Sequence, residues 1–216
     1  MRLTVAVRGA TKRTIVRSLP SVGTSVARDV SGTRDRIEGA AIKLFARHGV
    51  SGTSMRDIAR EADVSLGGMY THYPSKEALA WELFSRNWAM IGNDLRAHAR
   101  AAKPSLRSQL RAMTAYVFNL HKQDPDMVTF IYFSRHEHLR RVKSSLPNPY
   151  MMMRLVIADA IARGEIPHQD VEVATAMVSG ILIQMIDSKA LGRIKQDLTR
   201  ISDSVADRCH QLLLGG

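Results

Sequence analysis

Cysteine and long apolar runs are scarce in this chain of 216 residues. The single cysteine, Cys209, excludes an internal disulfide and leaves no cysteine cluster for a metal, which fits a reducing cytoplasm. Met151–Met153 and Ile181–Ile183 are far shorter than the roughly 20 apolar residues of a membrane span. No stretch alternates apolar and polar residues as a strand does. We therefore expect an all-α cytoplasmic protein with no membrane segment, metal or cofactor.

Acidic residues are also in short supply. The chain has 20 Asp and Glu against 31 Lys and Arg, a net charge of +11. Residues 1–80 carry 13 basic and 7 acidic residues, so the charge density is higher in this part. Such an excess favours a polyanionic partner such as nucleic acid. A generally basic proteome would give the same balance, so the charge alone does not decide.

Residues 36–79 carry the clearest pattern, which predicts three short helices and the start of a fourth. The first has apolar residues at helical spacing and a glycine that ends it; these are Ile37, Ala40, Ala41, Leu44, Phe45 and Gly49. Ser54 and Asp57 have the spacing of a capping box, which predicts a second helix. Asp63 and Val64 form a turn, and Ser65 caps a third helix from Leu66 to about Thr71. Two short helices across a tight turn are typical of a helix-turn-helix that enters a DNA major groove.

This stretch closely resembles the DNA-binding domain of the TetR family of bacterial transcriptional regulators. Many residues match at fixed offsets: Ala40–Ala41, Leu44–Ala46, Gly49, Thr53–Ser54, Ile58–Ala59, Ala62, Val64–Ser65, Gly67, Tyr70, His72–Tyr73 and Ser75–Leu79. Asp63 departs from the family, which usually has glycine there, but Asp tolerates left-handed backbone better than most residues. Gly68 adds a second glycine to the recognition helix.

The resemblance implies a helix-turn-helix head at residues 32–78. A long helix joins it to a helical ligand-binding and dimerisation domain at residues 79–216. It also implies a homodimer that binds a double-stranded DNA operator and acts as a repressor released by a small-molecule effector. The alternative is a helical binding or scaffold protein that has lost specific DNA readout, for which Asp63 and Gly68 are the only support.

The family pattern and side-chain chemistry together predict the DNA contacts. Leu66, Gly67, Gly68 and Thr71 are expected at base edges, with Ser65 at the start of their helix. Tyr70, His72, Tyr73 and Lys76 are expected on phosphates, with Thr53 and Ser54 on the flanking backbone and Arg56 on a phosphate or a guanine. A core position is an equal alternative for Tyr70 and a weaker alternative for His72 and Tyr73.

Residues 1–31 differ from the rest of the chain, with six Lys or Arg and a single acid, Asp29. The composition is similar to that of a transit peptide. We expect a disordered tail. This expectation also covers a reading frame whose assigned start lies too far upstream. A basic arm that contacts phosphates or the minor groove is the alternative.

The remaining patterns predict helices at about 75–102, 105–122, 125 onward, 150–163, 171–191 and 198–214. In the resembled family the last two helices pair across a dimer. The residues expected there are Met177, Gly180, Ile181, Gln184, Ile201 and Val205. An intramolecular core is the alternative for these helices.

The effector is expected to be a small hydrophobic or aromatic molecule. Its candidate pocket residues are Tyr116, Met127, Phe130, Phe133, Tyr150 and Met153, with Gln184 and Asp187 as polar anchors. A core position is the alternative for each apolar residue in this set. Catalysis has little support: His136 and His138 flank Glu137, but residues two apart on a helix point in nearly opposite directions. We therefore expect no enzyme.

Overall fold

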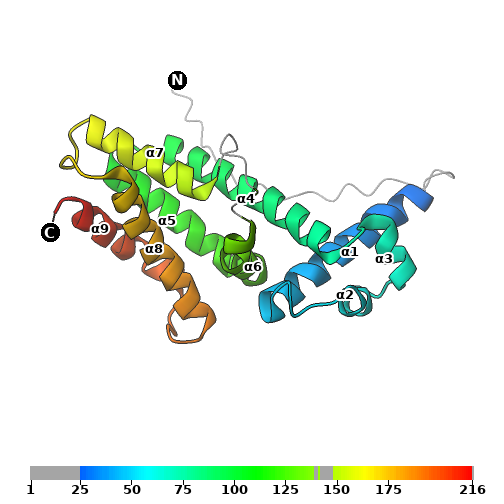
Figure 1. The fold of residues 1–216 in the computed structure, drawn as a ribbon. Coiled ribbons are helices and arrows are strands. Elements are labelled where there is room, and N and C mark those ends of the chain that lie inside the picture. The colour runs from blue at the N-terminus through cyan, green and yellow to red at the C-terminus, as the bar shows by residue number, and fades with distance from the viewer. Residues whose placement is uncertain (1–24, 139–140, 142–147, 216) are drawn as a thin grey trace, which may run out of the picture.

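The computed structural model describes residues 25–138, 141 and 148–215, with side chains from residue 32 onward, and this part is helical without strands. The helices are α1 (Ser25–His48), α2 (Met55–Glu61), α3 (Leu66–His72), α4 (Lys76–Ala101), α5 (Leu106–Gln123), α6 (Pro125–His138), α7 (Pro149–Ala162), α8 (Val171–Ala190), the short 3-10 helix η2 (Leu198–Arg200) and α9 (Ser202–Leu213). Helices α1–α3 form one end of the molecule, and α4 runs from that end into the bundle of α5–α9 (Figure 1). The predicted all-α class is confirmed.

Serine caps start the helices around the helix-turn-helix, as the sequence predicts. The Ser54 hydroxyl accepts from the Asp57 amide at 3.2 Å, and the Asp57 carboxylate accepts from the Ser54 amide at 3.1 Å. Ser65 caps α3 by accepting from the Gly68 amide at 3.0 Å. Ser75 caps α4 in the same way, through the Ala78 amide at 3.1 Å. Each cap satisfies an amide that has no partner within its helix.

Two residues with positive φ set the turns on either side of α2. Gly49, at φ 71°, ends α1 where the sequence predicts a stop. Asp63, at φ 53°, is the one non-glycine residue with positive φ in the described part of the chain. The prediction that the turn survives without glycine is therefore confirmed. Aspartate is among the residues that adopt this conformation most readily.

The end formed by α1–α3 joins the rest of the molecule through the chain, which continues from α3 into α4, and through the packing of α1. Helix α1 contacts α4, where Glu38 pairs with Arg86. It also packs on α6, where the rings of Phe45 and Phe130 lie 5.5 Å apart. Both rings are buried, so this contact is part of the hydrophobic core.

The C-terminal helix α9 packs on α5. Arg107 donates to the Asp207 carboxylate at 2.9 Å, and Arg111 pairs with the same carboxylate. Val205 and Cys209 are buried within the chain. The prediction that Val205 lies at a dimer contact is wrong, because its side chain is buried within its own chain. The last α-helix also starts at Ser202, after η2, and not at residue 198.

Helix α8 bears on the expectation that the chain has no membrane segment, although charged residues interrupt its apolar sequence. Its 20 residues, Val171–Ala190, include an 18-residue window of mean hydropathy 1.3, and 28% of that window is buried. By length and composition alone such a helix is able to cross a membrane, although core helices of soluble proteins have the same properties. Its apolar exposed side needs a covering partner of some kind.

The expected N-terminal tail is longer than the structure allows. Residues 25–31 belong to α1, so the prediction of disorder is wrong for them. The rest of the expected tail, residues 1–24, lies outside the described residues.

Candidate nucleic-acid interface and ligand cavity

Helix α3 is anchored on one side and open on the other. Met69 is fully buried and fixes the helix on the core. Gly67, Tyr70 and Thr71 are exposed, and Tyr70 keeps 53% of its surface accessible. The Thr71 hydroxyl donates to the Gly68 carbonyl at 2.6 Å, which leaves its oxygen lone pairs and its methyl group for an external contact. The open side of α3 therefore offers one aromatic ring, one acceptor and close backbone approach.

A polar groove of about 610 Å³ borders the open side of α3. It is lined by residues 51–57, Leu66, Tyr70 and residues 74–77. Lys76 lies in this groove and donates from Nζ to the carbonyls of Thr53 at 2.8 Å and Ser51 at 3.2 Å. An ammonium group has three donors, so one remains for an external oxygen. The groove is thus suited to an anion near the start of α4.

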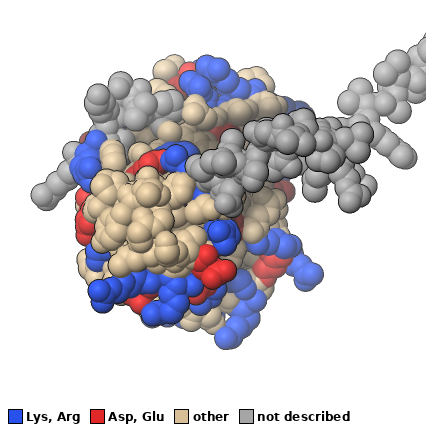
Figure 2. All heavy atoms as spheres, turned by 90° about the vertical axis from the view of Figure 1, so that its right-hand side faces the viewer, with Lys and Arg blue, Asp and Glu red and all other residues tan. Residues whose placement is uncertain are grey.

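Basic side chains gather at this end of the molecule. Figure 2 views it end-on and shows Lys and Arg along the lower edge, with fewer acidic residues among them and an uncharged patch above. Arg56 and Arg60 on α2 are exposed, although Arg60 pairs with Asp57 at 2.7 Å. Such an arrangement favours a phosphate backbone.

Two predicted DNA contacts are wrong because their side chains are buried. Tyr73 is only 2% exposed, and its hydroxyl donates to Glu38 at 2.7 Å. Thr53 is also buried, and its hydroxyl donates to the Gly49 carbonyl at 2.8 Å, which closes the loop before α2. Neither side chain can reach a phosphate from these positions. The other predicted residues lie on α3 or around the groove, with exposed or partly exposed side chains.

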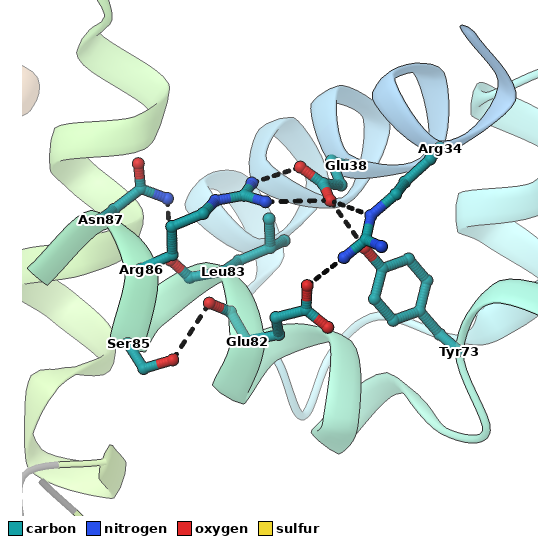
Figure 3. Close-up of polar contacts among 8 residues, drawn as sticks. All are labelled: Arg34, Glu38, Tyr73, Glu82, Leu83, Ser85, Arg86 and Asn87. Carbon is teal, nitrogen blue, oxygen red and sulfur yellow. Dashed lines mark hydrogen bonds and ion pairs between the residues drawn. The ribbon is translucent and has the colours of Figure 1, made fainter. Parts of the chain in front are cut away.

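Behind α3, a buried carboxylate joins α1, α4 and the residue that ends α3 (Figure 3). Glu38 on α1 accepts from the Tyr73 hydroxyl and from Arg34 Nε at 2.9 Å. It also pairs with both terminal nitrogens of Arg86 on α4, one of them at 3.2 Å. Burial alone would raise the pKa of Glu38, but the hydrogen bonds from Arg86, Tyr73 and Arg34 outweigh it and lower that pKa to about 2.

A second site is a largely apolar cavity of about 310 Å³ in the helical bundle. Its walls come from α4, α5, α6, α7 and α8, together with the residue that caps α7. The lining residues are Trp88, Leu95, Val117, Tyr132, Arg135, Asn148, Pro149, Tyr150, Met153, Ser179, Leu182 and Ile183. A volume near 300 Å³ is at the lower end of the range for small-molecule pockets.

The predicted effector residues only partly coincide with this cavity. Tyr150 and Met153 line it. The other six do not: Met127 and Phe130 are core residues, Tyr116 donates to Asp94 at 2.8 Å, Phe133 is 55% exposed, and Gln184 bonds to Asp187 at 3.1 Å. These six residues therefore do not line this cavity, and for Met127 and Phe130 the alternative of a core position holds. Tertiary packing, and not residue type, decides which aromatic and methionine side chains face the cavity.

The polar residues of the cavity escaped sequence analysis. Arg135 stands next to His136 and Glu137, so its surroundings in the sequence indicate solvent. Trp88 and Tyr132 have the spacing of core residues on their helices. No signal in the sequence separates Arg135 from its polar neighbours. Among the described residues, no group of three His, Cys, Asp or Glu is placed to hold a metal ion.

Comparison with known proteins agrees with this geometry. Residues 37–83 match the family described as bacterial regulatory proteins, tetR family. The Mycobacterium tuberculosis protein MftR, named as a transcriptional regulator of mycofactocin biosynthesis, is 32% identical over 147 residues, which are 64% of this chain and 68% of MftR. The transcriptional regulator AcrR of Shigella flexneri is 36% identical over 63 residues, 29% of this chain and 27% of AcrR.

Solved structures share the fold over most of the chain. The fatty acid degradation regulator FadR of Bacillus halodurans superposes with a TM-score of 0.68 at 22% identity, covering 85% of this chain and 95% of FadR. FadR of Bacillus subtilis, solved in complex with stearoyl-CoA, superposes with a TM-score of 0.66 at 20% identity, covering 82% of this chain and 97% of that FadR. These identities establish the shared fold alone.

The chain belongs to the TetR family of bacterial transcriptional regulators. It is a DNA-binding regulator of transcription, and the alternative of a scaffold protein is not favoured. The matched relatives are named as regulators of transcription.

Proposed function

We propose that the protein is a homodimeric repressor whose two α3 helices bind the half-sites of a near-palindromic operator. The observation that carries this proposal is the two-sided character of α3. Buried Met69 holds the helix, while Gly67, Tyr70 and Thr71 face outward. A two-fold dimer presents two such helices to successive turns of the major groove, spaced roughly 34–36 Å apart.

Within this proposal, Leu66, Gly67, Gly68 and Thr71 approach base edges. Tyr70, His72, Lys76, Ser54, Ser65 and Arg56 hold the flanking backbone. Residues 25–78 then form the DNA-binding unit, which adds the first turns of α1 to the predicted head. Residues 79–216 form the unit for effector binding and dimerisation.

The exposed side of α8 supports dimerisation. Val173, Met177, Gly180 and Gln184 recur at i, i+4, i+7 and i+11, and all four are exposed. Val173 is 56% exposed and Met177 40% exposed, values that leave apolar surface uncovered in one chain. We propose that this stripe, with Ile181 at its edge and Leu212 of α9, packs on a second copy in the cytoplasm. Ile201, at the junction of η2 and α9, stays a weaker candidate because it is partly buried in its own chain.

Helix α4 supports a link between effector and operator. Lys76, at its first residue, lies in the polar groove, while Trp88 and Leu95 of the same helix line the cavity. A rise of 1.5 Å per residue places Trp88 about 18 Å along the axis from Lys76. We propose that a small molecule in the cavity favours a tilt of α4 that separates the two recognition helices from their grooves. Ligand and operator then weaken each other reciprocally.

The first experiment is a gel shift with the DNA upstream of the protein's own gene. Expected is a specific complex on a near-palindromic site, with affinity that falls steeply as salt rises. Titration of that complex with small apolar molecules should release the DNA while sedimentation still shows a dimer. Failure to bind any upstream DNA, or release through dissociation into monomers, would contradict the proposal.

A further inference from the structure

Three of the polar residues that line the cavity, Trp88, Tyr132 and Arg135, present hydrogen-bond donors. Trp88 is 5% exposed, and its buried Nε1–H has no hydrogen-bond partner among the described residues. Buried polar groups nearly always have a hydrogen-bond partner, so a buried donor that is unpaired within the chain points to a partner from outside it. The N–H belongs to a residue that lines the cavity, where a ligand atom is able to accept from it.

Tyr132 lies beside Trp88, with the two rings 6.3 Å apart in an edge-on arrangement. Its side chain is buried, and its hydroxyl makes no hydrogen bond within the part of the chain that the structure describes. Burial raises the pKa of Tyr132 to about 12, and the nearby Arg135 only partly offsets this. At neutral pH the hydroxyl therefore keeps its proton and is available as a donor.

Arg135 brings a full positive charge to the same wall, one turn along α6 from Tyr132. One of its terminal nitrogens donates to the Tyr132 carbonyl. Within the described residues it has no ion pair, and none of the lining residues is an Asp or Glu. Four of the five guanidinium hydrogens thus stay available, with no acidic partner in the cavity.

Asn148 and Ser179 are the other polar lining residues, and most of the rest of the lining is apolar. Leu95, Val117, Met153, Leu182 and Ile183 supply this apolar surface. The Tyr150 ring also lines it, while the Tyr150 hydroxyl is engaged by Glu172 at 2.7 Å, and Glu172 is not a lining residue. A ligand that fills this space needs an apolar body and, at one end, an anionic group that accepts several hydrogen bonds.

We propose that the effector is an amphiphilic carboxylate, held by Arg135, Tyr132 and Trp88 at its charged end and by the apolar lining along its body. This rests on the proposed function, in which the cavity holds the effector. Residues Tyr132 and Trp88 then select an acceptor, and Arg135 selects the negative charge. An apolar molecule of the same shape without the charge leaves these donors desolvated and unpaired.

The test uses decanoate with its uncharged ester, methyl decanoate, and the cation decylamine, each titrated calorimetrically into the full-length protein below its micelle concentration. Expected is a preference for decanoate. Arg135→Gln should weaken the binding of decanoate by roughly 10- to 100-fold, which corresponds to the loss of a charge-assisted hydrogen bond. The affinity for methyl decanoate should be unchanged. Trp88→Phe, which removes the N–H and keeps a ring, should reduce the same preference.

Arg154→Gln is the matched control. Arg154 is an arginine of α7 that pairs with Glu172 and does not line the cavity, so its loss should leave decanoate binding unchanged. Decanoyl-CoA distinguishes a free carboxylate from a thioester, whose charges lie on distant phosphates. Tighter binding of decanoyl-CoA that is insensitive to Arg135→Gln would overturn the inference.

Equal binding of decanoate, its ester and the amine, or no binding by any of them, would also overturn it. A different measurement tests the proposed function. If the ligand-free protein does not bind its operator, the proposed function is contradicted, and this outcome does not depend on the charge of any effector.

Discussion

The hydroxyl of Tyr73 donates a 2.7 Å hydrogen bond to the carboxylate of Glu38, 35 residues earlier in the chain. Tyr73 directly follows α3, and Glu38 lies on α1, so this bond ties the end of the recognition helix to the first helix. Arg86 binds the same carboxylate from α4. The orientation of α3 relative to α4 therefore depends on one buried charge.

Glu38→Gln should lower the free energy of unfolding by about 1.5–3 kcal/mol, because a neutral amide cannot replace charge-assisted bonds to two arginines. Urea denaturation followed by circular dichroism measures the loss. Tyr73→Phe removes only the hydroxyl donor and should cost about 0.5–1.5 kcal/mol. An unchanged midpoint for Glu38→Gln would show that the cluster contributes no net stability.

The low pKa of Glu38 also predicts a pH dependence of stability. The folded-state pKa is about 2, against an ordinary value of 4.5, so the unfolded chain binds this proton more readily. The contribution of Glu38 is complete above about pH 5 and is lost as the pH falls from 4.5 towards 2. Unfolding free energies measured over this range should fall more steeply for the wild type than for Glu38→Gln. Parallel curves for the two proteins would contradict this assignment.

Lys76→Ala should weaken binding to all DNA sequences about equally and reduce the slope of log affinity against log salt by about 0.9, the value for one phosphate contact. Thr71→Ala should change base preference and leave that slope intact. Gel shifts over a salt series with operator and scrambled DNA test both variants. Because Lys76 also bonds to the carbonyls of Ser51 and Thr53, each variant needs a matching circular dichroism spectrum. A change of base preference in Lys76→Ala at constant slope would show that its assigned role is wrong.

Met177→Glu should convert the dimer into monomers, because it places a charge in the centre of the apolar stripe on α8. Sedimentation velocity gives the mass, and gel shifts should show a parallel loss of operator affinity. Leu155→Glu is a matched control on the exposed side of α7, where Leu155 is 49% exposed. A dimer that persists in Met177→Glu, or dissociates equally in Leu155→Glu, would place the interface elsewhere.

Met153→Phe should block the effector response and leave operator binding intact, because the larger ring fills space in the cavity without approaching α3. Met90→Phe, at an exposed position of α4, is the control and should respond normally. Release of the operator complex is followed by fluorescence anisotropy during ligand titration. An equal response in both variants would place the effector outside this cavity.

Local sequence signals predicted the helix-turn-helix closely. The caps at Ser54, Ser65 and Ser75 and the turn at Asp63 depend on residues within four positions of each other, so the sequence contains the whole interaction. The C-terminal region shows where this fails: the chain inserts η2 before α9, although the apolar pattern begins at Leu198.

The sites were less predictable because they form between helices. The sequence predicts Tyr73 as a phosphate contact at the surface, but packing places its hydroxyl against Glu38. Trp88, Tyr132 and Arg135 come together only when α4 and α6 pack, and no spacing in the sequence reveals that meeting. Val205 lies on the apolar face of its helix, but the sequence does not show whether α5 or a second copy packs on that face.

The contact between Phe45 and Phe130 has a mechanical consequence. The end formed by α1–α3 is held by its chain connection to α4, by the ion pair of Glu38 with Arg86 on α4, and by Phe45 on α6. Helix α6 carries both Phe130 and the cavity residues Tyr132 and Arg135, while α4 carries Trp88. A molecule in the cavity therefore touches both helices that hold this end, and we infer that a shift of either helix moves the recognition helix with it.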